Sequence, residues 1–231
     1  MKRWLVGACV ATAFVGTACS SSPSAPPVVS PTGGSHGQGH HRAQGDGQSP
    51  IPTESPVPIE SNPPGDIPDS TRFPPYHSSK GAFTLKVPEG WSRRTTGSSV
   101  SFSDKLNSIT VQWFAASKAP TVAGANSKEV PQLRRTERAF SLKEVLACAP
   151  TCTIPYTTNP IDVHLPSGQA VVIRYFDNSA PNSVTGKQYR DEVVRFEFFK
   201  KGTEAALILA GPVGSDNVDP WRLVSESFAW S

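Results

Sequence analysis

The low content of large apolar side chains between Ser20 and Arg72 restricts folding to the rest of the chain. This segment consists mainly of Pro, Ser, Gly and Thr. Such a composition cannot bury enough apolar surface to offset the conformational entropy lost on ordering. We therefore expect residues 19–72 to form a disordered tether, stiffer where proline-rich and looser where glycine-rich. The remaining residues 73–231 have the size of one domain with its own core.

The first nineteen residues have the pattern of an export signal. Two cations, Lys2 and Arg3, precede an uncharged apolar run that ends at Ala18, and this run is too short to span a bilayer. The small residues before Cys19 resemble the lipobox that bacterial lipoprotein-processing enzymes recognise. We expect cleavage after Ala18, so that residues 1–18 are the signal peptide, and lipidation of Cys19. The alternative is an ordinary signal with cleavage at a nearby alanine.

This interpretation places the mature protein at the cell membrane, lipid-anchored on the extracytoplasmic face. The membrane is then one partner, reached through the N-terminal lipid. Removing Lys2 and Arg3 with the signal leaves 20 cationic against 19 anionic side chains. Such near-neutrality argues against nucleic acid as a partner, because neutralising phosphates requires a basic stripe. We interpret Arg134, Arg135 and Arg138 as a solvated helix face, with a weak role near anionic lipid left open.

The tether contains three of the five histidines: His36, His40 and His41. Clustered imidazoles can bind copper or zinc weakly. No cysteine or carboxylate completes a ligand set at a fixed spacing, so an incidental polar spacer is the favoured interpretation. The sequence predicts neither a metal site nor a cofactor.

Two cysteines, Cys148 and Cys152, remain in the folded part. An even pair in an oxidising compartment favours a disulfide. The alternative is a redox or copper-binding loop, which requires a strand before it and a helix directly after it. The residues that follow, 153–160, instead continue as a loop interrupted by prolines. We expect a structural disulfide that pins a surface excursion.

Hydrophobic periodicity predicts a mixed fold with a meander first. Residues 82–87 alternate apolar and polar side chains and end at turn residues, as a strand does. Residues 100–102 and 108–114 form two further strands around a turn. Pro120 suits a first helical turn, and Pro131 must break or kink that helix.

The second half predicts a central sheet and a closing helix. Strands are expected over 168–176 and around 194–198, with a tight hairpin at Gly202. The return strand 205–210 is apolar on both faces and should lie centrally, covered on both sides. The closing helix should have Asp219 as its N-cap, followed by proline in the first turn. Its apolar stripe is formed by Trp221, Val224 and Phe228.

Three phrases of the sequence carry a family resemblance. Residues 83–91 (FTLKVPEGW) resemble the opening of PsbP-like domains. Together with residues 179–187 and 211–221, they make residues 80–231 similar to LpqN-type lipoproteins of high-GC Gram-positive bacteria. The resemblance implies an α+β fold, a three-layer α/β/α sandwich around an antiparallel sheet. It also implies a binding or assembly module, whose partner would be an envelope protein or a small ligand. The excursion at Cys148 and Cys152 fits no part of the pattern.

An enzymatic function finds little support in the sequence. There is no Gly-x-Ser-x-Gly motif, and the two domain histidines, His77 and His164, have no nucleophile or carboxylate at a recognisable spacing. Asp216 and Asp219 are explained as turn and capping residues. A non-enzyme is favoured, and the alternative is a cell-envelope hydrolase. Convergence of two or more of these four side chains within hydrogen-bond reach in a cleft would favour the hydrolase.

Two polar loops are the candidate binding sites. Loops 178–188 and 211–219 are rich in Asn, Ser, Gly and Asp and follow strands predicted to be central. Loops anchored on a rigid sheet are where binding residues concentrate. If they act in binding, we expect both loops on one rim of the sheet, with Asn182, Lys187, Asp216 and Asn217 facing a shared groove. The alternative is turn chemistry and helix capping alone.

Overall fold

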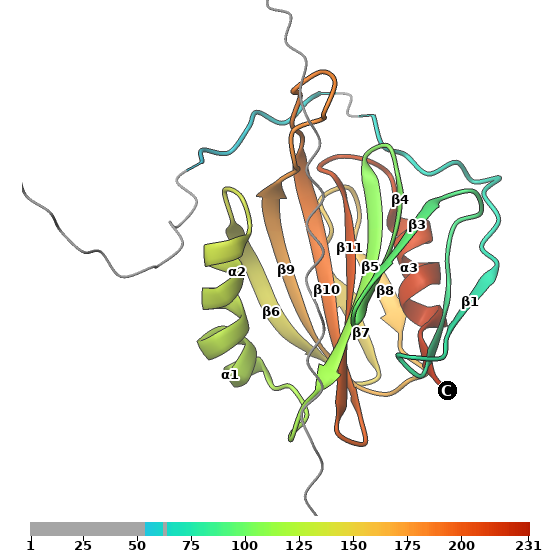
Figure 1. Ribbon diagram of the computed structural model, residues 1–231. Coiled ribbons are helices and arrows are strands. Elements are labelled where there is room, and N and C mark those ends of the chain that lie inside the picture. The colour runs from blue at the N-terminus through green and yellow to red at the C-terminus, as the bar shows by residue number, and fades with distance from the viewer. Residues whose placement is uncertain (1–53, 62–63) are drawn as a thin grey trace, which may run out of the picture. The chain divides into compact units, whose positions relative to one another are not determined.

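The computed structural model describes residues 54–61 and 64–231. The signal peptide, Cys19, the tether up to residue 53 and its histidines lie outside this range. The centre of the fold is an antiparallel seven-stranded sheet, shown in Figure 1. In spatial order its strands are β3 (Ser92–Thr96), β4 (Ser99–Asp104), β5 (Asn107–Ala115), β11 (Thr203–Pro212), β10 (Arg190–Lys200), β9 (Ala170–Asn178) and β6 (Ser141–Cys148).

Strand β11 occupies the middle of this sheet, as the apolar run 205–210 predicts. It pairs with β10 through a two-residue turn whose residues, Lys201 and Gly202, both have positive φ (47° and 82°). Such turns match the twist of the flanking strands, and glycine adopts this conformation at low cost. The predicted strands at 100–102, 108–114 and 168–176 are also present.

One face of the sheet, which we call the helical face, packs against a short helical layer. This layer comprises α1 (Val122–Gly124), a π-helical turn η1 (Ala125–Glu129) and α2 (Val130–Thr136). Pro131 sits in the first turn of α2, where its missing N–H costs nothing. The helical segment therefore continues past the proline, because it changes from a π-helical turn to an α-helix just before Pro131.

The helical layer covers only part of its face. Its apolar residues pack on side chains of β6, β9, β10 and β11. Strands β4 and β5 turn Val100, Phe102, Ile109 and Val111 toward the other face, which leaves serine, threonine and glutamine at the alternate positions. Figure 1 shows α1 and α2 beside β6 and β9, with β4 and β5 toward the opposite edge of the sheet.

The opposite face, which we call the core face, contains the main hydrophobic core. It is covered by helix α3 (Val218–Ser227) and two small antiparallel sheets. These consist of β1 (Pro75–Ser78), β2 (Phe83–Lys86) and β12 (Ala229–Trp230), and of β7 (Thr151–Ile154) and β8 (Ile161–His164). The fold is therefore α+β with three layers, as expected.

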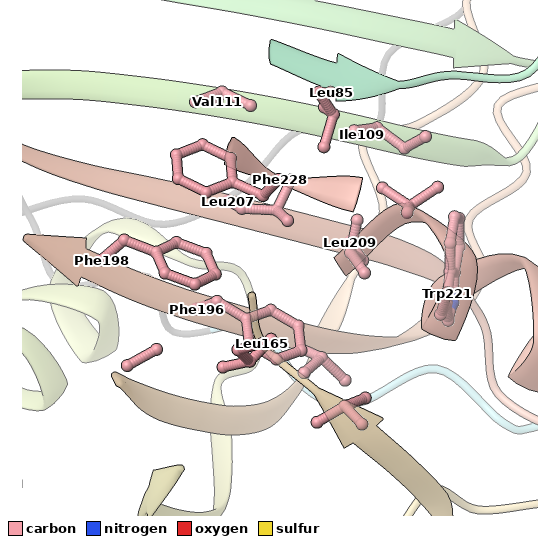
Figure 2. Close-up of a cluster of buried hydrophobic side chains, with 14 of the residues drawn as sticks. Leu85, Ile109, Val111, Leu165, Phe196, Phe198, Leu207, Leu209, Trp221 and Phe228 are labelled. Carbon is pink, nitrogen blue, oxygen red and sulfur yellow. The ribbon is translucent and has the colours of Figure 1, made fainter. Parts of the chain in front are cut away.

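Aromatic stacking closes this core from the C-terminal side. Phe228 stacks on Phe198 at 4.3 Å and on Phe83 at 5.5 Å between ring centroids. The predicted stripe of α3 is buried, since Trp221, Val224 and Phe228 are at most 1% exposed. Figure 2 shows Phe228 beside Leu207 of β11, with Trp221 at another side of the same cluster of labelled core residues.

The start of α3 differs from the prediction. Its N-cap position is Asn217, whereas Asp219 lies in the first turn and pairs with Arg222 at 2.7 Å. A carboxylate in the first turn still interacts favourably with the positive end of the helix dipole. Asp219 therefore stabilises the helix start without capping it.

The cysteine pair forms the expected disulfide. Cys148 ends β6 and Cys152 lies in β7, with Cα atoms 5.1 Å apart. Residues 155–160 of the segment predicted as a loop are the connection between β7 and β8, and only residues 153–154 belong to a strand. The β7–β8 hairpin packs on α3 and contributes Ile154, Ile161 and Val163 to the core. The bond fixes the point at which the chain leaves the large sheet for this hairpin.

The expected boundary between tether and domain at residue 72 is wrong. Residues 64–72 lie against the domain, where Ile67 is 5% exposed and packs in the main core. Its backbone N–H donates to Asn217 Oδ1 at 2.9 Å. Hydrogen bonds to Gly65 and Asp66 add to these contacts, so the domain holds a segment whose composition resembles a tether.

Two isoleucines of this region provide a matched test. Ile67→Ala should lower the free energy of unfolding by about 2–4 kcal/mol, because it leaves a cavity in the core. Ile59→Ala should have almost no effect, since Ile59 is 56% exposed. Urea denaturation of both variants measures this difference. Equal stability of the two variants would contradict the packing of Ile67.

Candidate binding sites around the central sheet

The two predicted loops lie at the same end of the sheet. One joins β9 to β10 and the other follows β11, and Asp191 at the start of β10 is the register partner of Pro212 at the end of β11. We call this end the rim. The four residues expected to share a groove there have different environments.

Asn217 has a structural position inside the fold. Its side chain is fully buried, and its amide nitrogen donates to Gly65 O, Asn107 Oδ1 and Ser215 Oγ at 3.0–3.1 Å. Its oxygen accepts the N–H of Ile67. The prediction that Asn217 faces a groove is therefore wrong. Sequence reasoning could not detect this, because the partners are up to 152 residues away.

Asp216 is exposed, and its backbone N–H donates to Asp66 Oδ1 at 2.8 Å. Asn182 and Lys187, by contrast, line one pocket of about 220 Å³ with Asp191 and residues of the β4–β5 turn. The structure therefore brings together two of the four predicted residues. Neither Asp216 nor Asn217 lines that pocket.

Both pocket residues also make local contacts. Asn182 Oδ1 accepts the N–H groups of Val184 and Thr185, which shapes the loop as an Asx turn does. Lys187 Nζ pairs with Glu60 and lies 4.9 Å from the centre of the Tyr189 ring. The hydrogen bond that Lys187 donates to Glu60 raises the pKa of Lys187. A binding role for Asn182 and Lys187 stays a prediction.

Asn217→Ala should destabilise the protein by about 2–3 kcal/mol. It leaves the N–H of Ile67 and the acceptors around the lost amide without their partner in a buried site. Asp216→Ala, one residue away and exposed, should change stability little. Thermal unfolding of both variants gives the comparison. An unchanged melting temperature for Asn217→Ala would show that this network contributes nothing to stability.

Two acids face each other at the rim, a feature that sequence reasoning missed. Asp177 of β9 and Asp191 of β10 are register partners on the helical face. Burial raises the pKa of Asp177 to about 8, with a further contribution from Asp191. Burial likewise raises the pKa of Asp191 to about 7, and Arg190 opposes this shift. Like charges directly across a ladder are destabilising, so the pair favours retaining a proton near neutral pH.

This pair predicts a pH dependence of stability. A carboxyl group whose pKa is higher in the folded state stabilises the fold when protonated, and that contribution is lost as pH rises from about 4 toward 8. Asp191→Asn should therefore flatten the decline in stability between pH 5 and pH 8. Asp177 and Glu204, whose pKa values are also raised, should preserve part of the decline.

Urea denaturation at pH 5 and pH 8 measures this effect, with exposed Asp216→Asn as the control. If wild type and Asp191→Asn lose the same stability over this pH interval, the carboxyl of Asp191 does not titrate as described.

A larger cleft of about 580 Å³ lies between α2 and the sheet. Its sheet side includes Tyr175, Arg195 and Ile208, and continues onto Gln112 and Phe114 of β5. The helical side is contributed by Glu129, Gln132, Leu133, Thr136 and Glu137. The cleft therefore opens onto the half of the helical face that no helix of residues 54–61 and 64–231 covers.

The charged groups beside the cleft are largely desolvated. Arg195 is 9% exposed, and its Nε donates to Glu197 Oε1 at 2.9 Å. Burial raises the pKa of Glu197, opposed by Arg195. Burial also raises the pKa of nearby Glu204 to about 7. Along β10, Arg195 and Glu197 alternate with the core residues Val194, Phe196 and Phe198. This alternation in the sequence indicates that the opposite, helical face of the strand carries polar groups.

A third groove of about 590 Å³ runs along α3 and is lined by His164, Asp219 and Glu226 among others. The backbone N–H of His164 donates to Glu226 Oε1 at 3.0 Å. Of the four residues whose convergence would favour a hydrolase, His164 and Asp219 line this groove. His77 lies on β1, paired with Thr84, and Asp216 lies at the rim. No hydrogen bond joins His164 to Asp219 in the part of the chain that the structure describes.

Within residues 54–61 and 64–231, no three His, Cys, Asp or Glu side chains are grouped as metal ligands. Over the same residues, no helix has the length and apolar character needed to cross a membrane.

Comparison with known proteins gives structural neighbours only. No protein-family model matches the chain, and no curated protein matches it in sequence. The chain is similar to the solution structure of cyanobacterial PsbP (CyanoP) from Synechocystis, with a TM-score of 0.45 and 14% identity, covering 74% of this chain and 100% of that chain. It is also similar to the Ran-binding protein Mog1p of Saccharomyces cerevisiae, with a TM-score of 0.37 and 10% identity, covering 68% of this chain and 88% of that chain.

A third similar structure is a Pseudomonas aeruginosa protein of unknown function described as a putative regulator. Its TM-score is 0.35 at 13% identity, with 65% of this chain and 91% of that chain covered. A PsbP structure is thus among the similar chains, as the sequence resemblance implied. Identities and TM-scores this low carry no conclusion about binding or catalysis.

Proposed function

We propose that the protein is a lipid-anchored binding or assembly module on the extracytoplasmic face of the cell membrane, of the LpqN lipoprotein type. The N-terminal signal pattern ending in Cys19 supports the anchor. The disulfide between Cys148 and Cys152 supports an oxidising compartment, because such bonds rarely persist in a reducing cytosol.

The single observation that carries the binding role is the incomplete helical layer. A three-layer fold buries its sheet most fully when helices cover both faces, yet no described helix packs on the helical face of β4 and β5, which presents Ser, Thr, Gln112 and Phe114. The cleft beside α2 adjoins this surface and is lined by the largely buried Arg195 and by the aromatic ring of Phe114, which is 43% exposed. Concave sites that combine such groups are typical of ligand binding.

Localisation can be tested with one substitution. Cys19→Ala removes the acyl acceptor, so the protein should leave the membrane fraction or remain unprocessed, whereas wild type should show an N-terminal peptide with acyl mass. Membrane fractionation and mass spectrometry of that peptide measure both. A wild-type N-terminal peptide without lipid would contradict the proposed anchor.

The binding role can be tested by crosslinking in intact envelope followed by capture of the protein. A Gln112→Ala/Phe114→Ala variant should lose captured partners at an unchanged melting temperature. Leu223→Ala is the matched control, because Leu223 is a similarly exposed apolar residue (37%) on the α3 groove. Partners lost only in the control would assign binding to that groove, and partners kept by the double variant would exclude the cleft.

A further inference from the structure

Residues 54–60 lie on the rim as an extended acidic segment. Their sequence is Glu-Ser-Pro-Val-Pro-Ile-Glu, with a carboxylate at each end and two prolines between. Figure 1 shows this segment passing beside the loop that joins β9 to β10. The contacts resemble those between a protein and a bound peptide, and they come from three kinds of group.

The backbone of the segment is recognised by one buried amide. Asn178 is 3% exposed, and its Nδ2 donates to Ser55 O at 2.8 Å while its Oδ1 accepts the N–H of Val57 at 3.2 Å. Arg190 Nη1 also donates to this oxygen, at 3.1 Å, and so fixes the amide orientation. A preorganised amide that satisfies one donor and one acceptor selects extended backbone rather than a particular side chain.

The two terminal carboxylates have separate partners. Glu54 accepts from Arg138 Nη1 at 3.0 Å and from Gln188 Nε2 at 2.6 Å. Glu60 pairs with Lys187. The hydrogen bond from Gln188 is the largest influence lowering the pKa of Glu54. The rim thus provides matched groups for both ends of the segment.

The segment is held far less firmly than the residues that follow it. Ile59, its largest apolar side chain, is 56% exposed, whereas Ile67 is 5% exposed in the core. Exposed ion pairs contribute little to stability. A segment with little apolar burial can open locally without unfolding the domain. The contacts of residues 54–60 are therefore specific enough to position the segment and weak enough to let it dissociate.

We propose that the rim surface formed by Asn178, Arg138, Gln188 and Lys187 is a binding site for extended, acidic, proline-containing protein segments. Residues 54–60 are its built-in, displaceable ligand. The chemistry of the competing segment follows from the contacts: an exposed backbone N–H and C=O for Asn178, between two carboxylates six residues apart. Prolines at intermediate positions favour the extended form, which spans about 19 Å over six residues.

This site is separate from the cleft beside α2, and its existence does not depend on lipidation. It also couples binding to the tether. When a partner segment replaces residues 54–60, those residues join the tether and lengthen it by about 20 Å if they stay extended. Binding of a partner segment at the rim would therefore increase the distance that the domain can reach from its N-terminal attachment.

The test uses the full chain and a synthetic peptide of residues 53–61. Three substitutions, Glu54→Gln, Val57→Pro and Glu60→Gln, remove both carboxylates and the N–H that Asn178 accepts. The labelled wild-type peptide should bind this release variant at least about tenfold more tightly than wild type, in which the tethered segment competes at a millimolar effective concentration. A peptide with the same three substitutions should not bind. Fluorescence anisotropy measures both affinities.

A second pair of variants locates the site. Adding Arg138→Ala and Lys187→Ala to the release variant should weaken peptide binding about tenfold without changing the melting temperature, because two exposed ion pairs are lost while the hydrogen bonds with Asn178 remain. Adding Arg135→Ala instead, an exposed arginine of α2, should leave binding intact. NMR signals of the Asn178 side-chain amide should shift on peptide addition. The proposal is overturned by no binding to the release variant up to low-millimolar peptide, by equal affinity for wild type, or by a peptide affinity that does not change when Arg138 and Lys187 are removed.

Discussion

The pairing of β10 with β11 is the interaction on which the rest of the structure depends. The ladder runs from Asp191 opposite Pro212 to Lys200 opposite Thr203, at the centre of the large sheet. Along it, Phe196, Phe198, Leu207 and Leu209 build the core face on which α3 and the small sheets pack. The Lys201–Gly202 turn sets this register, and a slip of one residue would exchange the two faces of both strands.

The same alternation places the polar chemistry. Because side chains along β10 alternate between faces, burying its aromatic residues puts Asp191, Arg195 and Glu197 on the helical face. Asp191 meets Asp177 at the rim, while Arg195 and Glu197 lie beside the cleft under α2. The core and the candidate sites are therefore two consequences of one strand register. The buried charges of this central strand are tolerated because they are paired or keep a proton.

Short-range sequence patterns predicted the central strand, the docking face of α3 and the disulfide. The apolar run 205–210 indicated the central strand, and the stripe through Trp221 and Val224 indicated how α3 docks. The cysteine spacing indicated the disulfide but not the β7–β8 hairpin, because residues 153–160 contain prolines and read as loop. The role of Asn217 depends on partners 110 to 152 residues away and has no local signature. Composition also misplaced the domain boundary, since a single isoleucine, Ile67, decides where the tether ends.

Residues on the two sides of that boundary have a similar composition, but the domain holds them with different strength. Residues 64–72 have Ile67 in the core and share its hydrogen-bond network, so releasing them would expose apolar surface and break buried hydrogen bonds. Residues 54–60 are held by Asn178 and by two half-buried carboxylates whose cationic partners are exposed, so water can replace these partners at little cost. The free energy of release therefore changes abruptly between the two parts. A chain pulled or displaced from its N-terminal side should open up to about residue 61 and stop, because the next contact along it belongs to the core.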